Sequence, residues 1–222
     1  MRAPRFAAVF FDLDGTLADS AQDITLALEF AFAEVGVRPE NPVHLLVDGS
    51  PLEAIFALAA PGSTSAHFAR FASAYRARYE TLGHQNTRLY PGVRETLDAL
   101  SLLRPRPFLA VATAKRSATA RSVCQHLGIE QHFPAIEGTA GTTLAPKPAP
   151  DLLHLLLRRA ESPPDRCLLV GDTLRDIFAG KAAGMRTAAA TWGHGRREEL
   201  VRANPDHILE DLEDLIPLFS DP

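Results

Sequence analysis

The sequence predicts an α/β fold in which a parallel sheet has helices on both faces and is interrupted by an all-helical module. The first observation is that short continuous apolar runs recur along the chain, each followed by turn residues and a helical pattern. Such runs are typical of strands buried on both faces, and their alternation with helices is typical of a parallel sheet. The second observation is that this rhythm stops between residues 20 and 83.

The predicted elements of the sheet follow one another in order. The first strand is the run FAAVFF at residues 6–11, and a weaker strand is expected near residues 135–137. Further strands are predicted at residues 108–112, 167–170 and 187–190. The helices between them are predicted at residues 93–103, 117–127, 151–160 and 176–183. Gly128 and Gly184 mark the ends of two of these helices, since glycine commonly follows a helix.

Residues 20–83 are predicted to be a separate helical domain inserted after the first strand. Apolar residues recur there at helical spacing, and no strand pattern is present. Glycine and proline interrupt the helical pattern at residues 36–42, 49–51 and 61–65. Residues 1–19 and 84–222 would then form the α/β domain.

The amino-acid composition argues against several classes of partner and location. The 222 residues are 46% hydrophobic and 23% charged, with a net charge of −4 and no basic run, so we expect neither a nucleic-acid nor a membrane-surface partner. The first apolar run is too short for a signal peptide, and no stretch reaches the ~18 apolar residues of a membrane helix. Cys124 and Cys167 are expected to be buried free thiols, which favours a cytoplasmic protein.

The strongest motif is DLDGT, directly after the first strand. Asp12 and Asp14 are two residues apart, so in an extended chain both face one side, at the edge where open α/β sheets bind ligands. Gly15 permits a tight turn immediately afterwards. Two neighbouring carboxylates repel unless a cation lies between them or one is protonated, and Mg²⁺ suits such oxygen ligands. A solvated acidic loop is the alternative interpretation.

A second acidic motif, GDTLRD, follows the strand at residues 167–170. Asp172 and Asp176 are four apart, so they share a face if a helix begins at this point. Capping of a helix N-terminus by Asp172 is the plainer alternative. Because both acidic motifs lie at carboxyl ends of strands, we favour a shared site.

Two further positions complete the candidate site. Thr113 ends the strand at residues 108–112, where a hydroxyl and neighbouring N–H groups can hold a phosphate oxygen. Lys147 is one of three lysines in the chain and lies between Pro146 and Pro148, which stiffen its flanks.

Together these residues resemble the haloacid dehalogenase superfamily. DLDGT is similar to its first motif, Thr113 to its second, Lys147 to its third, and the Asp172–Asp176 pair to its fourth. The inserted helices resemble the first type of cap in that family, which implies a Rossmann-like core. The segments at residues 89–93, 180–185, 191–193 and 205–208 resemble the phosphoglycolate phosphatase branch. Ala114 and Gly180 depart from it, since many relatives carry Asn and Ala there.

The resemblance implies a Mg²⁺-dependent phosphatase for a small phosphorylated metabolite, acting as a monomer or homodimer. Asp12 would form an aspartyl-phosphate, and Asp14 would act as general acid and then general base. Thr113, Ala114 and Lys147 would hold the phosphoryl group, and Lys147 would also restrain Asp12. Mg²⁺ would bind an Asp12 oxygen, the Asp14 carbonyl and Asp172, with Asp176 supporting it from behind or through water. The helical domain would close over the site about hinges near residues 17–20 and 84–91.

Other chemistries are weighed against this one. Asp14 argues against a dehalogenase, because a halide needs no proton, and the lack of lysine in residues 20–83 excludes a Schiff-base phosphonoacetaldehyde hydrolase. An inorganic pyrophosphatase and a β-phosphoglucomutase-like mutase stay open. A non-catalytic phospho-acceptor domain of the receiver type is disfavoured by the chain length and the helical insert.

The residues that select the substrate are less well defined by the sequence. Candidates in the helical domain are Ser50 with the Asp48-Gly49 turn, Arg76 and Arg78, although each also fits a surface or structural role. We expect His194 to be exposed.

Overall fold

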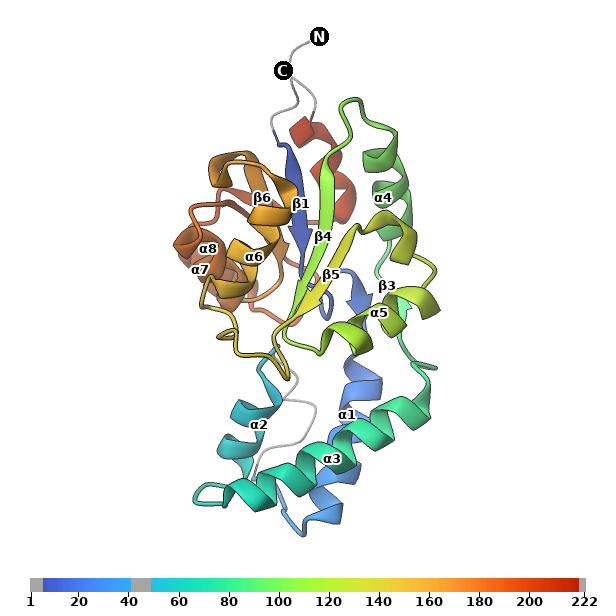
Figure 1. Cartoon of the computed structure of the whole chain (residues 1–222), viewed down its shortest axis with the longest axis vertical. Coiled ribbons are helices and arrows are strands. Elements are labelled where there is room, and N and C mark those ends of the chain that lie inside the picture. Colours follow the sequence, from blue (N-terminus) through green and yellow to red (C-terminus); the bar gives the residue numbers. More distant parts are fainter. Residues whose placement is uncertain (1–5, 41–48, 220–222) are drawn as a thin grey trace.

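A six-stranded parallel sheet is the centre of the larger part of the molecule in the computed structural model, which describes residues 6–40 and 49–219 (Figure 1). The strand order is β5-β4-β1-β6-β7-β8, so the chain proceeds outward from β1 first on one side and then on the other. The strands are β1 (Ala8–Phe11), β4 (Phe108–Thr113), β5 (Ala135–Gly138), β6 (Cys167–Gly171), β7 (Arg186–Ala190) and β8 (His207–Leu209). The order therefore reverses beside β1, at its boundary with β6.

Successive residues of the central strand pack into different cores. Val9 and Phe11 belong to the cluster on one face, whereas Ala8 and Phe10 belong to the cluster on the other. Alternation of this kind follows from the two-residue period of a strand and explains why β1 is apolar throughout.

Helices cover both faces of the sheet, so it is the middle layer of three (Figure 1). The face of Val9 is covered by α4 (Val93–Leu102), α5 (Ser117–His126) and the C-terminal 3-10 helix (Leu212–Phe219). The face of Phe10 is covered by α6 (Asp151–Ala160) and α7 (Leu174–Ala182). The short helix α8 (Arg197–Arg202) packs beside α7 through Leu200.

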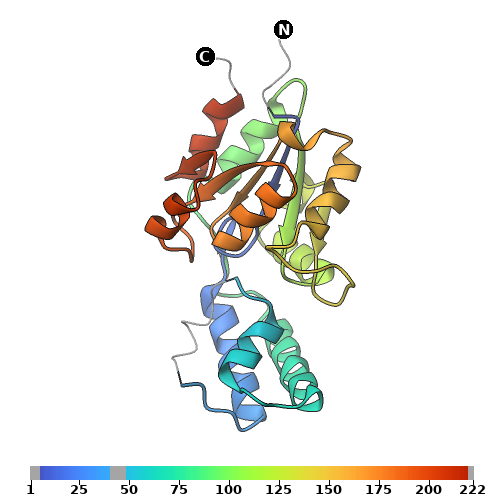
Figure 2. The same cartoon turned by 90° about the vertical axis from the view of Figure 1, so that its left-hand side faces the viewer.

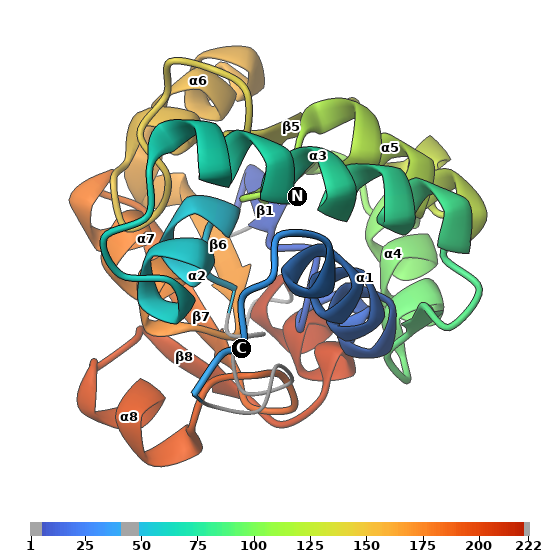
Figure 3. The same ribbon diagram turned by 90° about the horizontal axis from the view of Figure 1, so that it is seen from below.

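Three helices form a separate layer beyond the carboxyl ends of the strands (Figures 1 and 2). They are α1 (Ala21–Glu34), α2 (Leu52–Ala59) and α3 (Ser65–Leu82). Their own core contains Leu28, Phe32, Phe56 and Phe71, with the Phe32 and Phe71 ring centres 4.7 Å apart. Seen from below, α3 runs across the end of the sheet, whereas α1 is seen nearly along its own axis (Figure 3).

Two linkers join this helical layer to the sheet and pair with each other. β2 (Ala18–Asp19) and β3 (Arg88–Leu89) form a short antiparallel ribbon. Asp23, in the first turn of α1, accepts hydrogen bonds from the backbone N–H and side-chain amide of Asn86 and from the hydroxyl of Thr87, at 2.7–3.1 Å. The two linkers are therefore held side by side.

The predicted elements of the sheet are confirmed to within a few residues, including the weaker strand at β5. The sequence did not identify β2, β3 or β8, since segments of two or three residues carry no periodic pattern. Part of the break predicted at residues 36–42 lies outside the described residues. Both cysteines are free and buried, as predicted. None of the described helices has the length and apolar character that crossing a membrane requires.

Candidate functional site

The predicted site residues gather where the strand order reverses. The backbone N–H of Asp12, just after β1, donates to the carbonyl of Val170 in β6 at 2.9 Å. On the other side β4 pairs with β1 in register, with Phe11 opposite Val111, so Thr113 ends β4 close to the level of Asp12. Open α/β sheets bind ligands at such a reversal, outside the carboxyl ends of the strands.

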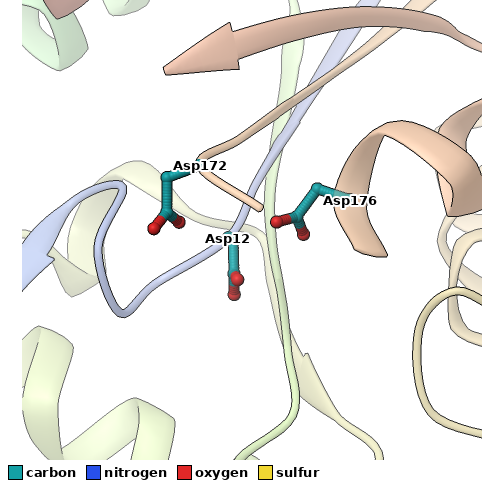
Figure 4. A group of neighbouring side chains, drawn as sticks. All are labelled: Asp12, Asp172 and Asp176. Carbon is teal, nitrogen blue, oxygen red and sulfur yellow. The ribbon is translucent and has the colours of Figure 1, made fainter. Parts of the chain in front are cut away.

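Three buried carboxylates meet at this point. Asp12, Asp172 and Asp176 each offer an oxygen, and these oxygens lie within 4.8 Å of one another. Figure 4 shows the three side chains coming from the ends of β1 and β6 and from the start of α7 toward one space. A compact set of carboxylate oxygens is the donor set that a hard divalent cation such as Mg²⁺ prefers.

Asp172 is fixed in place by its neighbours. One of its oxygens accepts a hydrogen bond from the Thr16 hydroxyl, and the other accepts one from the backbone N–H of His194, each at 2.8 Å. A Cβ on Gly15, whose φ is +81°, would lie 2.1 Å from an Asp172 oxygen. The glycine in DLDGT is therefore needed for the close approach of this carboxylate as well as for the turn.

The second acidic motif is arranged differently from the helical face expected for it. Helix α7 begins at Leu174, so Asp172 precedes the helix and only Asp176 lies within it. Thr173 is the residue before the helix, and its hydroxyl and backbone N–H both donate to Asp176. This capping box fixes the Asp176 carboxylate toward Asp12.

Lys147 lies between two of the carboxylates. Its ammonium is 3.0 Å from an Asp12 oxygen, it also contacts Asp176, and it donates to the carbonyl of Ala112 at 2.9 Å. Burial alone would lower the pKa of Lys147, but the carboxylates of Asp12 and Asp176 raise it above its usual value. The lysine therefore stays charged.

Asp12 has a strongly shifted pKa without a bound cation. Burial is the main cause and, with the repulsion of Asp176 and Asp172, it raises the pKa of Asp12 to about 8 although Lys147 opposes the shift. Crowded carboxylates of this kind favour either a proton or a metal ion among them.

Asp14 faces a different set of partners. It accepts a hydrogen bond from the Ser20 hydroxyl, and one of its oxygens lies 2.9 Å from the Lys115 ammonium. Burial would raise the pKa of Asp14, but Lys115 and the Ser20 hydrogen bond outweigh burial and lower it. Asp12 and Asp14 thus differ in environment. Asp12 lies among the carboxylates of Asp172 and Asp176, whereas Asp14 lies beside the ammonium of Lys115.

The predicted phosphate-binding positions lie next to these carboxylates. Thr113 is buried, and its hydroxyl accepts a hydrogen bond from the backbone N–H of Lys115 at 3.2 Å. Lys147 contacts the carbonyl of Ala112, one residue before Thr113. Ala114, the following residue, lines a cavity of about 130 Å³ that opens beside Asp14.

The candidates in the helical layer separate into two groups. Gly49, Ser50 and Arg76 line the cavity, and Ser50 accepts a hydrogen bond from Arg175 of α7 at 2.6 Å. Arg78 is turned away to the Phe30 ring, 5.7 Å from its centre. Asp48 lies outside the described residues.

The prediction that His194 is exposed is wrong. Only 12% of its side chain is exposed, and its Nδ1 lies 3.3 Å from Asp172. Burial lowers the pKa of His194, but the nearby carboxylate of Asp172 outweighs burial and raises it. Tight contact between its loop and the first turn explains the position, since a Cβ on Gly193 would lie 2.3 Å from the carbonyl oxygen of Gly15.

Sequence reasoning also missed Lys115, Ser20 and Thr16, although each contacts a predicted site carboxylate. For Lys115 a signal existed, because it follows the end of β4 by two residues and is one of the chain's few lysines.

Comparison with known proteins shows one matching family and several similar sequences. Residues 9–190 match the model of a family described as haloacid dehalogenase-like hydrolase. The chain is 35% identical over 191 residues to the tyrosine-protein kinase PtkA of Mycobacterium tuberculosis. The matched region covers 86% of this chain but only 64% of that protein. It is 31% identical to a 5'-nucleotidase of Pseudomonas aeruginosa, over 95% of this chain and 94% of the relative. It is 34% identical to a phosphoglycolate phosphatase of Agrobacterium fabrum, over 96% and 92% of the two chains.

A solved structure shares the whole architecture. The crystal structure of a predicted phosphoglycolate phosphatase from Haemophilus somnus matches with a TM-score of 0.85 at 26% identity and covers 97% of this chain and 99% of that one. The sheet and the helical layer are both included in a match of that extent.

Proposed function

The chain belongs to the haloacid dehalogenase-like hydrolase family, and from this premise we propose that it is a Mg²⁺-dependent phosphatase of small phosphomonoesters. One observation carries the proposal: three buried carboxylates from separate segments converge within 4.8 Å, and an ammonium contacts two of them. Proximity of this kind supplies the nucleophile, the metal ligands and the phosphoryl-binding charge that phosphoryl transfer requires.

The residues fit a magnesium ion. Mg²⁺ prefers a few carboxylate oxygens and keeps several waters, and the acidic group is buried, compact and all oxygen. We propose that Asp12, Asp172 and the backbone carbonyl of Asp14 hold the ion, with Asp176 supporting it. When bound, the ion supplies positive charge that offsets the charge of the phosphoryl oxygens.

Asp12 is the proposed nucleophile. Its oxygen attacks phosphorus, the bond between phosphorus and the ester oxygen breaks, and an aspartyl-phosphate forms. Asp14, whose pKa is lowered in the free protein, must first take up a proton in the substrate complex, and it then gives this proton to the departing ester oxygen, which leaves as an alcohol. Asp14 then takes a proton from the water that attacks the aspartyl-phosphate, so that inorganic phosphate leaves and both carboxyl groups return to their starting state.

Lys147, Thr113 and Ala114 are the proposed phosphoryl-binding residues. Lys147 already neutralises part of the charge on Asp12 at 3.0 Å and is held rigidly by the Ala112 carbonyl. A fixed ammonium and hydroxyl stabilise the charge that develops on the phosphoryl oxygens without reorganising during the reaction.

Residues 20–83 are the proposed cap over this site, and residues 1–19 and 84–222 are the proposed core. The cavity beside Asp14 has walls from both parts, which supports substrate binding between them. Closure of such a layer excludes water from the reaction. A monomeric or homodimeric state and a cytoplasmic location stay predictions from the sequence.

Phosphoglycolate is the proposed substrate. The relatives include phosphoglycolate phosphatases that the chain matches over nearly its full length. The cavity volume of about 130 Å³ supports a small leaving group, since it equals the space of roughly four water molecules. Pyrophosphate hydrolysis and a β-phosphoglucomutase-like transfer are the alternatives that the experiment must separate.

A phosphate-release assay tests this function. The purified protein is incubated with Mg²⁺ and each member of a panel that contains phosphoglycolate, other small phosphomonoesters, a nucleoside monophosphate and pyrophosphate. We expect phosphate release from phosphoglycolate, its loss in excess EDTA, and its return with Mg²⁺. Interconversion of sugar phosphates without net release would show a mutase, and a stable phosphorylated protein without turnover would show a phospho-acceptor domain.

A further inference from the structure

The cavity beside Asp14 is the space in which the leaving group of a substrate would lie. Asp14 lines it, whereas Asp12, Thr113 and Lys147 do not, so the cavity extends from the reaction centre on the side of the proposed general acid. This reasoning rests on the proposed function, in which Asp14 protonates the leaving oxygen. The chemistry of the cavity wall then indicates which leaving groups are accepted.

One part of that wall is a buried ammonium. Lys115 has 12% of its side chain exposed, and its Nζ lies 2.9 Å from an Asp14 oxygen and 4.8 Å from the centre of the Tyr79 ring. In residues 6–40 and 49–219, Asp14 is its one carboxylate partner. An ammonium has three N–H donors, so Lys115 has donor capacity left for a ligand in the cavity.

The same lining also carries two guanidinium groups. Arg76 comes from α3 and Arg116 from the residue before α5, and both line the cavity. Neither guanidinium has an ion pair or a hydrogen bond within the part of the chain that the structure describes. Burial and the nearby charge of Arg116 lower the pKa of Arg76, although the carboxylate of Glu53 opposes the shift.

The remaining wall limits the size of the occupant. Ile24 and Leu28 of α1 and Ile55 of α2 supply apolar surface, and Glu53 and Glu80 lie on the same lining. A cavity volume of about 130 Å³ favours a leaving group of two or three carbons over a long or bulky one. Asp14 is ionised beside Lys115 in the free protein. Once Asp14 takes up the proton that the general-acid step requires, the charge of Lys115 is left for the substrate.

We propose that Lys115 is a specificity-determining residue that binds a carboxylate on the leaving group, with Arg76 and Arg116 as further cationic groups of the same cavity lining. A buried ammonium beside Asp14 strengthens the binding of a short carbon chain that carries a negative charge. It disfavours a leaving group that is neutral or positively charged. Lys115 thus selects phosphoesters of short hydroxy acids over phosphoesters of simple alcohols.

Binding of two non-hydrolysable phosphonates measures this selection directly. 3-Phosphonopropionate has the shape of phosphoglycolate with a carbon in place of the ester oxygen, and propylphosphonate has a methyl group in place of the carboxylate. Calorimetric titration with Mg²⁺ should show that the wild-type protein binds the carboxylated compound at least tenfold more tightly, which is the range of one charge-assisted hydrogen bond. The ratio should fall to about one in Lys115→Met and stay at the wild-type value in Lys181→Met, which also removes one lysine.

Further variants separate charge from packing. Lys115→Arg should retain part of the preference, and Arg76→Met should reduce it several-fold, whereas Arg70→Met on the exposed side of the same helix should not change it. Thermal unfolding of each variant checks the fold, and the ratio of two affinities cancels any shared loss of phosphonate binding.

Two outcomes would overturn the role of Lys115: equal binding of the two phosphonates by the wild-type protein, or a preference that survives Lys115→Met. Failure of the proposed function is a different result. If the protein prefers the carboxylated phosphonate through Lys115 but releases no phosphate from any phosphomonoester, the proposed role of Lys115 holds and the proposed phosphatase activity is wrong.

Discussion

Asp12 is the residue at which the charges of the site converge. It lies among Asp172, Asp176 and Lys147, and without a cation its pKa is raised to about 8, chiefly by burial. A proton and a metal ion therefore compete for the same carboxylate. This competition has a measurable sign, because a protonated carboxyl is a poor metal ligand.

Magnesium binding should release protons at neutral pH. At pH 7 most Asp12 is protonated in the metal-free protein, so each bound ion should displace about one proton, and the affinity should rise with pH until about pH 8 and then level off. Calorimetric titrations of Mg²⁺ in two buffers that differ in ionisation enthalpy count these protons. Asp12→Asn should abolish the pH dependence, and an affinity that is constant from pH 6 to 9 would contradict the assigned ligand.

Lys147 should contribute strongly to stability as well as to the proposed chemistry. Lys147→Met leaves the buried carboxylate of Asp176, and the ionised fraction of Asp12, without their ammonium, which typically costs about 3 kcal/mol of unfolding free energy. Urea unfolding in EDTA at pH 7 measures the loss. The exposed Lys181, changed to Met in the same way, should cost about 0.5 kcal/mol or less; equal losses in the two variants would show that the buried ion pairs contribute little.

The linkers are the elements that determine how the helical layer is attached. The ribbon of β2 and β3 is only two residues long on each side, and Asp23 at the start of α1 extends its hydrogen bonding to Asn86 and Thr87. Asp23 and Thr87 are fully buried, so water cannot replace these bonds. We therefore expect the attachment to depend on one carboxylate more than on the ribbon itself.

Asp23→Ala should lower the free energy of unfolding by about 3 kcal/mol, because it removes three hydrogen bonds and leaves buried donors without an acceptor. Urea denaturation measures the change. Asp19→Ala, on the exposed side of the ribbon, is the matched control and should cost about 0.5 kcal/mol or less. If Asp23→Ala is as mild as the control, the linkers are held together by other contacts.

Sequence reasoning works best for elements with a repeated pattern. The strand β1 and the helix α6 have long apolar runs or clear helical spacing, and their positions were predicted to within two residues. The ribbon strands and β8 were missed because pairing partners, not local periodicity, define them. The start of α7 was misplaced because a capping box begins the helix at Leu174, ahead of the predicted first residue, Asp176.

Across the whole molecule, local motifs predicted the residues that form the site. They were less useful for the residues that contact those side chains and hold them in place. Asp12, Asp172 and Asp176 could be grouped from the sequence because each follows or adjoins the carboxyl end of a strand. The contact of Lys115 with Asp14 depends on β4 pairing directly with β1, and the burial of His194 depends on a loop that returns after β7. The order of the strands and the packing of a distant loop are tertiary properties, so a short sequence motif does not predict them.

The central claim concerns the whole assembled site, namely that phosphoryl transfer passes through Asp12. Asp14→Asn should slow release of the phosphoryl group more than its arrival, since water then lacks its general base. The variant is mixed with phosphoglycolate and Mg²⁺, quenched in acid, and digested for mass spectrometry of the peptide that contains residue 12. We predict one phosphoryl group on Asp12, absent when Asp12 is changed to Asn. Continued hydrolysis by the Asp12→Asn variant, with no phosphorylated peptide at any time, would contradict the account.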